Sequence, residues 1–280
     1  MKPVTKIVVV IVLFLIITAL GLIHFGFQRK ETTLRVFFGA AAEEPWKEII
    51  SEFEKKTGIK VEAVFGGSGT LLSQIEISKM GDIYAPGSPD YMVKALKKGL
   101  IDPESIRIVA YMVPAIIVPK GNPKNITCLR DLAKPGVRVS TGDPKTVCVG
   151  EYAVDLLKFN GLYDKVKGNI VVYAESCSKT AMLPATGAVD AIIGWHVFHY
   201  WYPDKTDIVW LKPNQIPKIS YIPIGILKYS KNPDAARKFI EFAVSSPFAK
   251  KVFRKYHYFA SEEEAREYAP YAQIPKLTPQ

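Results

Sequence analysis

A run of small residues separates an apolar strand pattern from a helical pattern. Residues 66–69 read Gly-Gly-Ser-Gly, and no lysine or arginine occurs within residues 64–78. A helix N-terminus offers free N–H donors and a partial positive charge, and glycines let the backbone approach a ligand closely. Ser68 adds a hydroxyl donor. The run therefore predicts a site for a small anion held by dipoles, while a tight turn with Ser68 as N-cap explains the same residues.

Three other strand-to-helix junctions are also rich in small or polar residues. They read GAAAEEP at 39–45, TGDPKTVCVGEY at 141–152 and AESCSKTAM at 174–182. In doubly wound sheets, ligands bind at the carboxyl ends of the strands. Four such junctions together favour the anion site over an isolated turn.

Catalytic sites are a weaker interpretation of the same sequence. His196 and His199 lie three residues apart, but no third metal ligand accompanies them. Neither Cys148 nor Cys177 lies in a nucleophile signature, and Ser68 lacks the final glycine of a G-x-S-x-G turn. We therefore expect neither an enzyme nor a metal centre.

Short apolar strands alternate with amphipathic helices from residue 34 onward. The predicted strands cover residues 34–40, 60–65, 82–88, 114–120, 138–143, 169–175, 190–195, 207–212 and 221–228. Helices follow most of them, and the last strong one begins at Pro233 and is stopped by Pro247. This alternation predicts an α/β fold with parallel sheets covered on both faces.

Proline-marked extended segments at 111–119 and 219–228 divide this pattern. They predict two crossings between two lobes, which is a hinge arrangement suited to closing on a ligand.

The composition allows a sizeable core and gives the chain a basic surplus. The chain has 280 residues, of which 48% are hydrophobic, and a formal net charge of +10. Residues 1–30 supply +4 of this charge. The remaining surplus fits a solvated lysine-rich surface or a field that attracts small anions. No run of five basic residues occurs, so we expect no nucleic-acid partner.

The N-terminal segment predicts membrane targeting. Residues 7–23 form 17 consecutive positions without a charge, and Lys2 and Lys6 precede them. This length lies between a signal peptide and a spanning helix, and no clear cleavage site follows. We predict that residues 1–32 are a signal anchor or signal peptide, and that the remainder lies outside the cytoplasm.

Three cysteines, Cys128, Cys148 and Cys177, fit no metal-binding spacing. In an exported protein they permit one disulfide with one free thiol, or three thiols. A sequon at Asn125 is a possible glycosylation site.

Five stretches carry a family resemblance. They read FFGAAAEEP, GGSGTLLSQIE, GDIYAPGSPDYMVKALKKGLID, VPKGNPKNITCLRDLAKPGVRVSTGDPKTVCVGEYA and TGAVDAIIGW. Together they resemble the extracytoplasmic molybdate- and tungstate-binding proteins of ABC importers, from about Arg35 to Phe253. The resemblance implies a two-lobed, type II periplasmic-binding-protein fold that closes on a tetrahedral oxyanion. Backbone amides, hydroxyls and a phenol hold the oxyanion in that family, without a salt bridge.

The resemblance also implies the site residues. By motif position these are Ala41, Ala42, Ser68, Gly69, Val149, Cys177 and Trp195. Ala42 stands where the family usually has serine, and Trp195 stands where a tyrosine normally offers its hydroxyl. Cys148 replaces the usual proline of the third loop. Because of these departures, the resemblance predicts the fold more strongly than it predicts the identity of the bound oxyanion.

The resemblance finally implies a function. The chain is expected to capture molybdate or tungstate, without a cofactor, for an ABC permease and its ATPase, as a monomer at the extracytoplasmic face of the membrane. Lobe one would comprise residues 33–113 with 222–280, and lobe two residues 114–221. Sulfate, phosphate or a small organic acid are alternative ligands, and a membrane-tethered sensor module is an alternative of another class.

Overall fold

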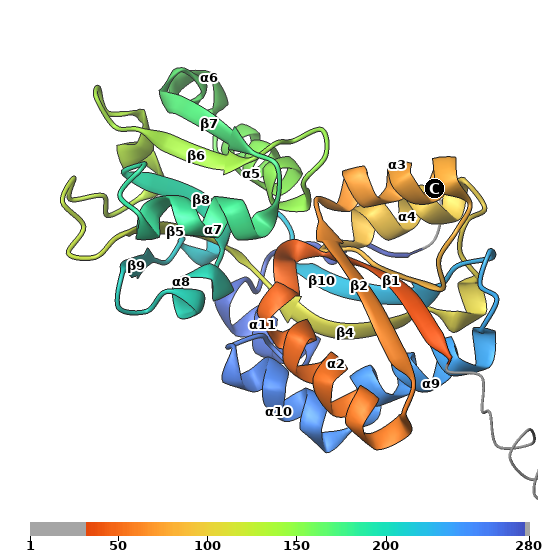
Figure 1. Ribbon diagram of the computed structural model, residues 1–280. Helices are drawn as coiled ribbons and strands as arrows, with labels where there is room; N and C mark the ends of the chain where they lie inside the picture. Colours follow the sequence, from red (N-terminus) through yellow and green to blue (C-terminus); the bar gives the residue numbers. More distant parts are fainter. Residues whose placement is uncertain (1–31, 278–280) are drawn as a thin grey trace, which may run out of the picture. The chain divides into compact units, whose positions relative to one another are not determined.

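The computed structural model describes residues 32–277, and the chain from Thr33 onward forms one compact unit. Within this unit lie two five-stranded sheets flanked by helices (Figure 1). The predicted N-terminal membrane segment lies outside the described residues. Among residues 32–277, no helix is both long and apolar enough to span a membrane.

The first sheet combines parallel and antiparallel strands in the order β2-β1-β3-β10-β4. Strand β1 pairs in parallel with β2 and β3, whereas β10 runs antiparallel to β3 and β4. The strands are β1 Thr33–Gly39, β2 Lys60–Gly66, β3 Ile83–Ala85, β4 Arg107–Met112 and β10 Ser220–Ile226. The parallel arrangement predicted for the strands that alternate with helices, β1 to β3, is confirmed, whereas β10 returns from the second sheet and adds antiparallel pairs with β3 and β4.

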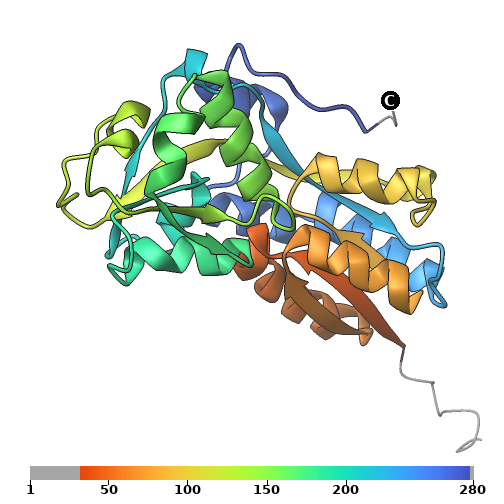
Figure 2. The same cartoon turned by 90° about the horizontal axis from the view of Figure 1, so that it is seen from above.

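Helices cover both faces of the first sheet. Helices α3 and α4 lie on one face, and α2, α9 and α10 lie on the other (Figures 1 and 2). Their bounds are α2 Glu43–Thr57, α3 Ser68–Ser78, α4 Pro89–Lys97, α9 Pro233–Ser245 and α10 Pro247–Lys255, with the short 3-10 helices η1 Ala40–Ala42 and η2 Pro103–Ser105.

Helix α2 shows how the sequence determines these elements. Trp46, Ile49 and Phe53 repeat at helical spacing, and all three are fully buried. The Trp46 ring packs 4.7 Å from the Phe38 ring of β1. Gly58 ends the helix with a φ of 71°, a left-handed conformation that favours glycine.

The second sheet has the order β7-β6-β8-β5-β9, in which β6 is parallel to β7 and β8, and β5 is antiparallel to β8 and β9. Its strands are β5 Pro114–Pro119, β6 Val139–Gly142, β7 Ile170–Ala174, β8 Ala191–Trp195 and β9 Thr206–Val209. Its helices are η3 Leu129–Ala133, α5 Cys148–Phe159, α6 Tyr163–Val166, η4 Lys167–Asn169, α7 Cys177–Ala185, α8 Val197–Trp201 and η5 Pro213–Gln215. The predicted α/β class with two sheets is confirmed.

The chain crosses between the two sheets twice. Strand β4 ends at Met112 in the first sheet and β5 begins at Pro114 in the second, and the chain returns between β9 and β10. The last helix, α11 Glu262–Tyr268, belongs to a C-terminal segment whose Ala265 and Ala269 are buried with residues of the second sheet. The lobe limits deduced from the sequence stay a prediction.

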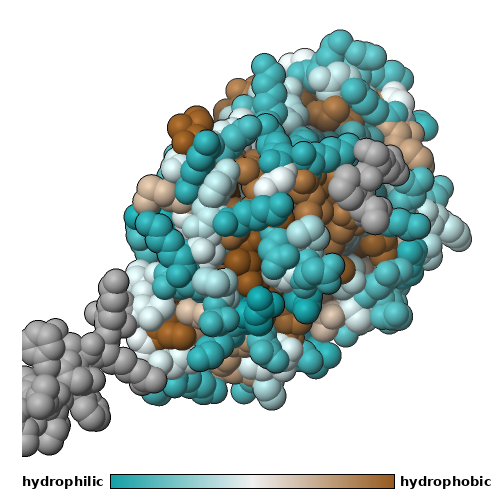
Figure 3. Space-filling model, turned by 90° about the vertical axis from the view of Figure 1, so that its right-hand side faces the viewer, coloured by the Kyte–Doolittle hydropathy of each residue, from teal (hydrophilic) through white to brown (hydrophobic). Residues whose placement is uncertain are grey.

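The surface carries the basic surplus. Hydrophilic residues cover much of the face in Figure 3, with hydrophobic residues visible between them. Among the ion pairs of the described residues, the most covered basic side chain is Lys218, with an exposed fraction of 18%. The lysine-rich character therefore belongs to the surface.

Candidate functional site

The starts of four helical segments, η1, α3, α5 and α7, meet where the two sheets and their helices contact each other. The Gly69 amide at the start of α3 donates to the Thr146 carbonyl at 2.8 Å, just before α5. Gly87, in the loop after β3, lies close to both η1 and the start of α5. A carbon added to it would lie 2.6 Å from Ala41 Cβ and 2.8 Å from Cys148 Sγ.

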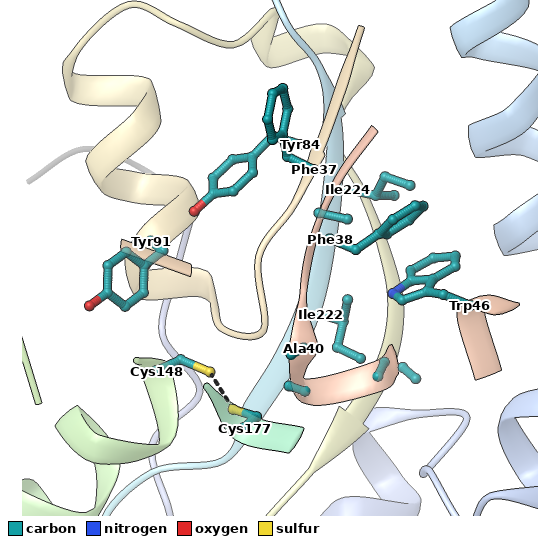
Figure 4. Packing of buried hydrophobic residues seen from close by; sticks show 14 of the residues in the cluster. Phe37, Phe38, Ala40, Trp46, Tyr84, Tyr91, Cys148, Cys177, Ile222 and Ile224 are labelled. Atoms are coloured by element: carbon teal, nitrogen blue, oxygen red, sulfur yellow. Dashed lines mark hydrogen bonds between the residues drawn. The ribbon is translucent and has the colours of Figure 1, made fainter. Parts of the chain in front are cut away.

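The first residues of α5 and α7 touch through their thiols. Cys148 Sγ and Cys177 Sγ lie 3.6 Å apart, as the dashed line in Figure 4 marks. Helix α7 also packs against η1. Because helix starts carry free N–H donors and partial positive charge, their convergence creates an environment that favours an anion.

The glycines of residues 66–69 make this convergence possible. A carbon added to Gly67 would lie 2.9 Å from both the Glu175 and the Thr146 carbonyl oxygens. Contacts this short with backbone atoms force the chain to move apart. The run is therefore needed for the close approach of the two sheets' helices, in addition to any contact with a ligand.

Ser68 is a buried hydroxyl at the start of α3. Its exposed fraction is 1%, and its Oγ accepts a hydrogen bond from the Gly87 amide at 3.0 Å. Among the described residues, no acceptor takes the proton of the Ser68 hydroxyl itself. The N-cap residue of α3 is Gly67, so the interpretation of Ser68 as the N-cap is wrong. Its hydroxyl is instead available to donate.

Trp195 is a second buried donor, at the end of β8. The side chain is fully buried, and its ring packs at 4.8 Å against the Tyr152 ring. The indole N–H has no hydrogen-bond partner of normal geometry among the described residues, although it lies near the Cys177 thiol. Buried donors are nearly always paired in folded proteins, so an unpaired one indicates a ligand or a water molecule.

The Cys177 thiol lies between donors from different elements. Burial, followed by the adjacent Cys148 thiol, raises the pKa of Cys177 well above its usual value. The nearby Val149 amide and Trp195 indole oppose this rise without making a hydrogen bond of normal geometry to the sulfur. Two of the predicted oxyanion donors thus converge on one sulfur atom.

Charged residues lie beside this centre but none belongs to the predicted set. Lys94 on α4 pairs with Glu151 on α5, and Lys218 lies 3.1 Å from Asp90 and 2.8 Å from Asp155. These pairs join α4 to α5. Burial raises the pKa of Glu151, and its hydrogen bond with Lys94 opposes that rise.

The structure brings the seven predicted residues to one region. All except Gly69, which is partly exposed, are buried. The set is Ala41, Ala42, Ser68, Gly69, Val149, Cys177 and Trp195. Their role in binding stays a prediction. Among residues 32–277, no cluster of three or more histidine, cysteine or acidic side chains could hold a metal ion.

Two residues that lie in this region were not among the site residues predicted from the sequence. The Tyr258 hydroxyl, from the C-terminal segment, donates to the Ala41 carbonyl at 2.5 Å and holds η1 in place. No sequence signal points to Tyr258, because it lies far along the chain. Gly87 was detectable, since Pro86-Gly87-Ser88 follows β3 as a fifth junction of small residues.

The histidines are structural. His196 is buried, the Val113 amide donates to its Nδ1 at 3.2 Å, and its Nε2 lies 2.9 Å from the His257 carbonyl oxygen. His199 Nδ1 lies 3.1 Å from the Thr206 hydroxyl. Both histidines therefore have structural hydrogen-bond contacts.

A family model described as bacterial extracellular solute-binding protein matches residues 34–259. The substrate-binding lipoprotein YvgL of Bacillus subtilis, described as a putative ABC transporter component, is 30% identical over 83% of this chain and 88% of its own. The molybdate-binding protein ModA of Rhodobacter capsulatus is 26% identical over 86% of this chain and 94% of its own.

The fold is shared with solved binding proteins. The sulfate-binding protein SubI of Mycobacterium tuberculosis superimposes with a TM-score of 0.72 and 18% identity, over 88% of this chain and 93% of its own. The match confirms the predicted periplasmic-binding-protein fold. The chain belongs to the family of bacterial extracellular solute-binding proteins, which bind solutes for transporters and are not enzymes.

Proposed function

We propose that this solute-binding protein captures a tetrahedral oxyanion, molybdate or tungstate, between its two lobes for an ABC importer. One observation carries the proposal. The Ser68 hydroxyl and the Trp195 indole are buried donors without a described acceptor, and they lie where helix starts converge. An oxyanion has only hydrogen-bond acceptors, so it could accept hydrogen bonds from both of these donors.

The absence of charge from the predicted set favours a small anion held by dipoles. Helix starts stabilise an anion by about 0.3–1 kcal/mol each at exposed sites, and by up to about 2 kcal/mol in partly buried geometries. A hydrogen bond to a charged acceptor contributes roughly 1.5–3 kcal/mol. Several such donors support strong binding without a lysine or arginine, as the resemblance to molybdate-binding proteins also implies.

The relatives support the choice of ligand. A relative of similar length is described as molybdate-binding, whereas a structural neighbour is described as sulfate-binding. Ala42 offers only its amide where the resemblance implies a serine hydroxyl. We assign molybdate or tungstate first because the sequence relative spans nearly the whole chain, and sulfate is the alternative.

The transport cycle follows from the fold. The ligand enters an open form, the lobes close about the two chain crossings, and the closed protein docks on the permease that an ATPase drives. Residues 1–32 hold the protein at the extracytoplasmic face of the membrane, and it acts as a monomer.

Calorimetric titration of the purified protein with molybdate, tungstate, sulfate and phosphate tests the proposal. We expect saturable binding of molybdate and tungstate that is tighter than binding of the other two anions. If sulfate bound more tightly than molybdate and tungstate, sulfate would be identified as the ligand instead. No heat with any of the four anions would refute an oxyanion function.

The variant Ser68→Ala tests the site itself. We expect oxyanion affinity to fall about tenfold to a hundredfold, because a charge-assisted hydrogen bond is lost. Ser73→Ala changes an exposed serine on the same helix and should leave affinity unchanged. Equal affinities of the two variants would remove Ser68 from the site.

A further inference from the structure

We propose that Cys148 and Cys177 form a reversible disulfide that switches the oxyanion site between a binding and a weakly binding state. The effect on ligand affinity rests on the proposed function, whereas the formation of the disulfide does not depend on it. The two sulfur atoms lie 3.6 Å apart, in contact, whereas Cys128 is separate from the pair and partly exposed. A protein outside the cytoplasm meets conditions in which such pairs oxidise.

The surroundings of the pair favour reaction when the lobes open. Each cysteine is the first residue of a helix, Cys148 of α5 and Cys177 of α7, where the free amides stabilise a thiolate. In this structure burial raises the pKa of Cys177, while the nearby Val149 amide and Trp195 indole oppose that rise; opening of the lobes would remove the effect of burial. In this structure both cysteines are buried, with exposed fractions of 1% for Cys148 and 2% for Cys177. Part of the cover of Cys148 comes from Gly87 of the first sheet's side, since a carbon added to Gly87 would lie 2.8 Å from Cys148 Sγ.

The oxidant is a small-molecule disulfide. One cysteine thiolate attacks a sulfur of that disulfide, forms a mixed disulfide and releases one thiol. The second cysteine thiolate then attacks the protein sulfur of the mixed disulfide and releases the other thiol. The protein loses two hydrogen atoms and the oxidant gains them. A thiol reductant reverses both steps.

The disulfide would act directly on the ligand site. In the reduced protein, the Cys177 side chain can turn away and release the Val149 and Trp195 donors to an oxyanion. A bond to Cys148 would fix the sulfur beside those donors and would remove both S–H groups. We therefore expect the oxidised protein to bind the oxyanion at least tenfold more weakly.

The test uses the full-length protein, reduced or treated with oxidised glutathione, followed by alkylation and peptide mass spectrometry. We expect oxidation to remove the alkylation of Cys148 and Cys177 while Cys128 stays alkylated. Saturating molybdate should slow the loss, because closure covers both sulfurs. Molybdate titrations of the reduced, oxidised and re-reduced protein should show the affinity falling and then recovering.

Two variants make the test specific. Cys128→Ala should behave like the unmodified protein, because Cys128 lies outside the pair. Cys148→Ala should form no internal disulfide and carry at most one glutathione on Cys177.

The outcomes separate the two proposals. Three alkylatable cysteines after oxidation overturn the disulfide, and an unchanged affinity in the disulfide form overturns the switch. A reduced protein that binds none of the four anions refutes the proposed function instead.

Discussion

At the scale of single residues, hydrogen-bond donors rather than charged side chains make up the proposed oxyanion site. Ala42, which replaces an expected serine, contributes no side-chain donor, and Trp195 offers an indole N–H in place of a phenol. An indole N–H can only donate, whereas a phenol can also accept. Since an oxyanion only accepts, this replacement preserves the function that the site requires.

The variant Trp195→Phe tests this argument. It removes the N–H while keeping an aromatic ring against Tyr152, so oxyanion affinity should fall about tenfold to a hundredfold, with little change in folding stability. Calorimetry and thermal unfolding measure the two effects. Trp46→Phe is the matched control, because the Trp46 indole is also buried and unpaired but packs beside Phe38 in the first sheet's core. A similar affinity for both variants would mean that the Trp195 indole does not contact the ligand.

At the scale of elements, the start of α3 depends on one glycine for the approach to the second sheet. Gly67→Ala places a carbon 2.9 Å from two carbonyl oxygens, so the lobes should close incompletely and affinity should fall at least tenfold. The fold should persist, since the φ of Gly67 is −62°, which alanine adopts easily. Small-angle X-ray scattering with and without molybdate measures the closure.

Gly66→Ala is the control for this prediction. A carbon there would lie 3.3 Å from the Leu71 side chain, and a side-chain end can move aside. If Gly67→Ala closed and bound as well as Gly66→Ala, the role of Gly67 in the approach would be wrong.

Local sequence patterns predicted most helices and strands. One helix, α10, was missed because a proline can end one helix and also begin the next. The stop predicted at Pro247 is confirmed, since α9 ends at Ser245, but the same proline also opens α10, which the sequence pattern did not predict. The Ser246 hydroxyl caps α10 by accepting from the Ala249 amide at 3.1 Å. Proline suits a first helical turn as well as it ends a helix.

The mixed sheets and the site geometry depend on contacts between distant residues. Strand β10 joins the first sheet after the chain has completed the second, so periodicity alone cannot give its direction. The site motifs were visible at the four junctions, whereas the contact from Tyr258 to the Ala41 carbonyl spans 217 residues of sequence. The sequence could therefore predict the loops of the proposed anion site, but not the distant residues that position these loops.

At the scale of the whole molecule, one lysine links a helix of the first sheet to a helix of the second sheet. Lys218 lies just before β10, pairs with Asp90 of α4 and Asp155 of α5, and lies 4.2 Å from the centre of the Tyr152 ring. Burial lowers the pKa of Lys218, but the two carboxylates outweigh it and the pKa is raised. The ammonium group is therefore retained between Asp90 of α4 and Asp155 of α5, and it stabilises the contact of these two helices.

His196 links one chain crossing to the C-terminal segment and makes stability depend on pH. Its Nδ1 accepts from the Val113 amide, and the proton on Nε2 is directed at the His257 carbonyl, so the ring is neutral. Burial lowers its pKa to about 4, from 6.5. Between these values the unfolded chain binds more protons than the folded protein, so the free energy of unfolding falls as pH falls.

We expect His196 to contribute roughly 3 kcal/mol to the loss of stability between pH 6.5 and pH 4. Urea unfolding across this range measures the slope. His196→Gln should be less stable at pH 7 but show a smaller slope, because glutamine does not titrate. His257→Gln is the control, since the exposed His257 residue should contribute less to the slope. An unchanged slope in His196→Gln would show that the ring is already protonated in the folded protein.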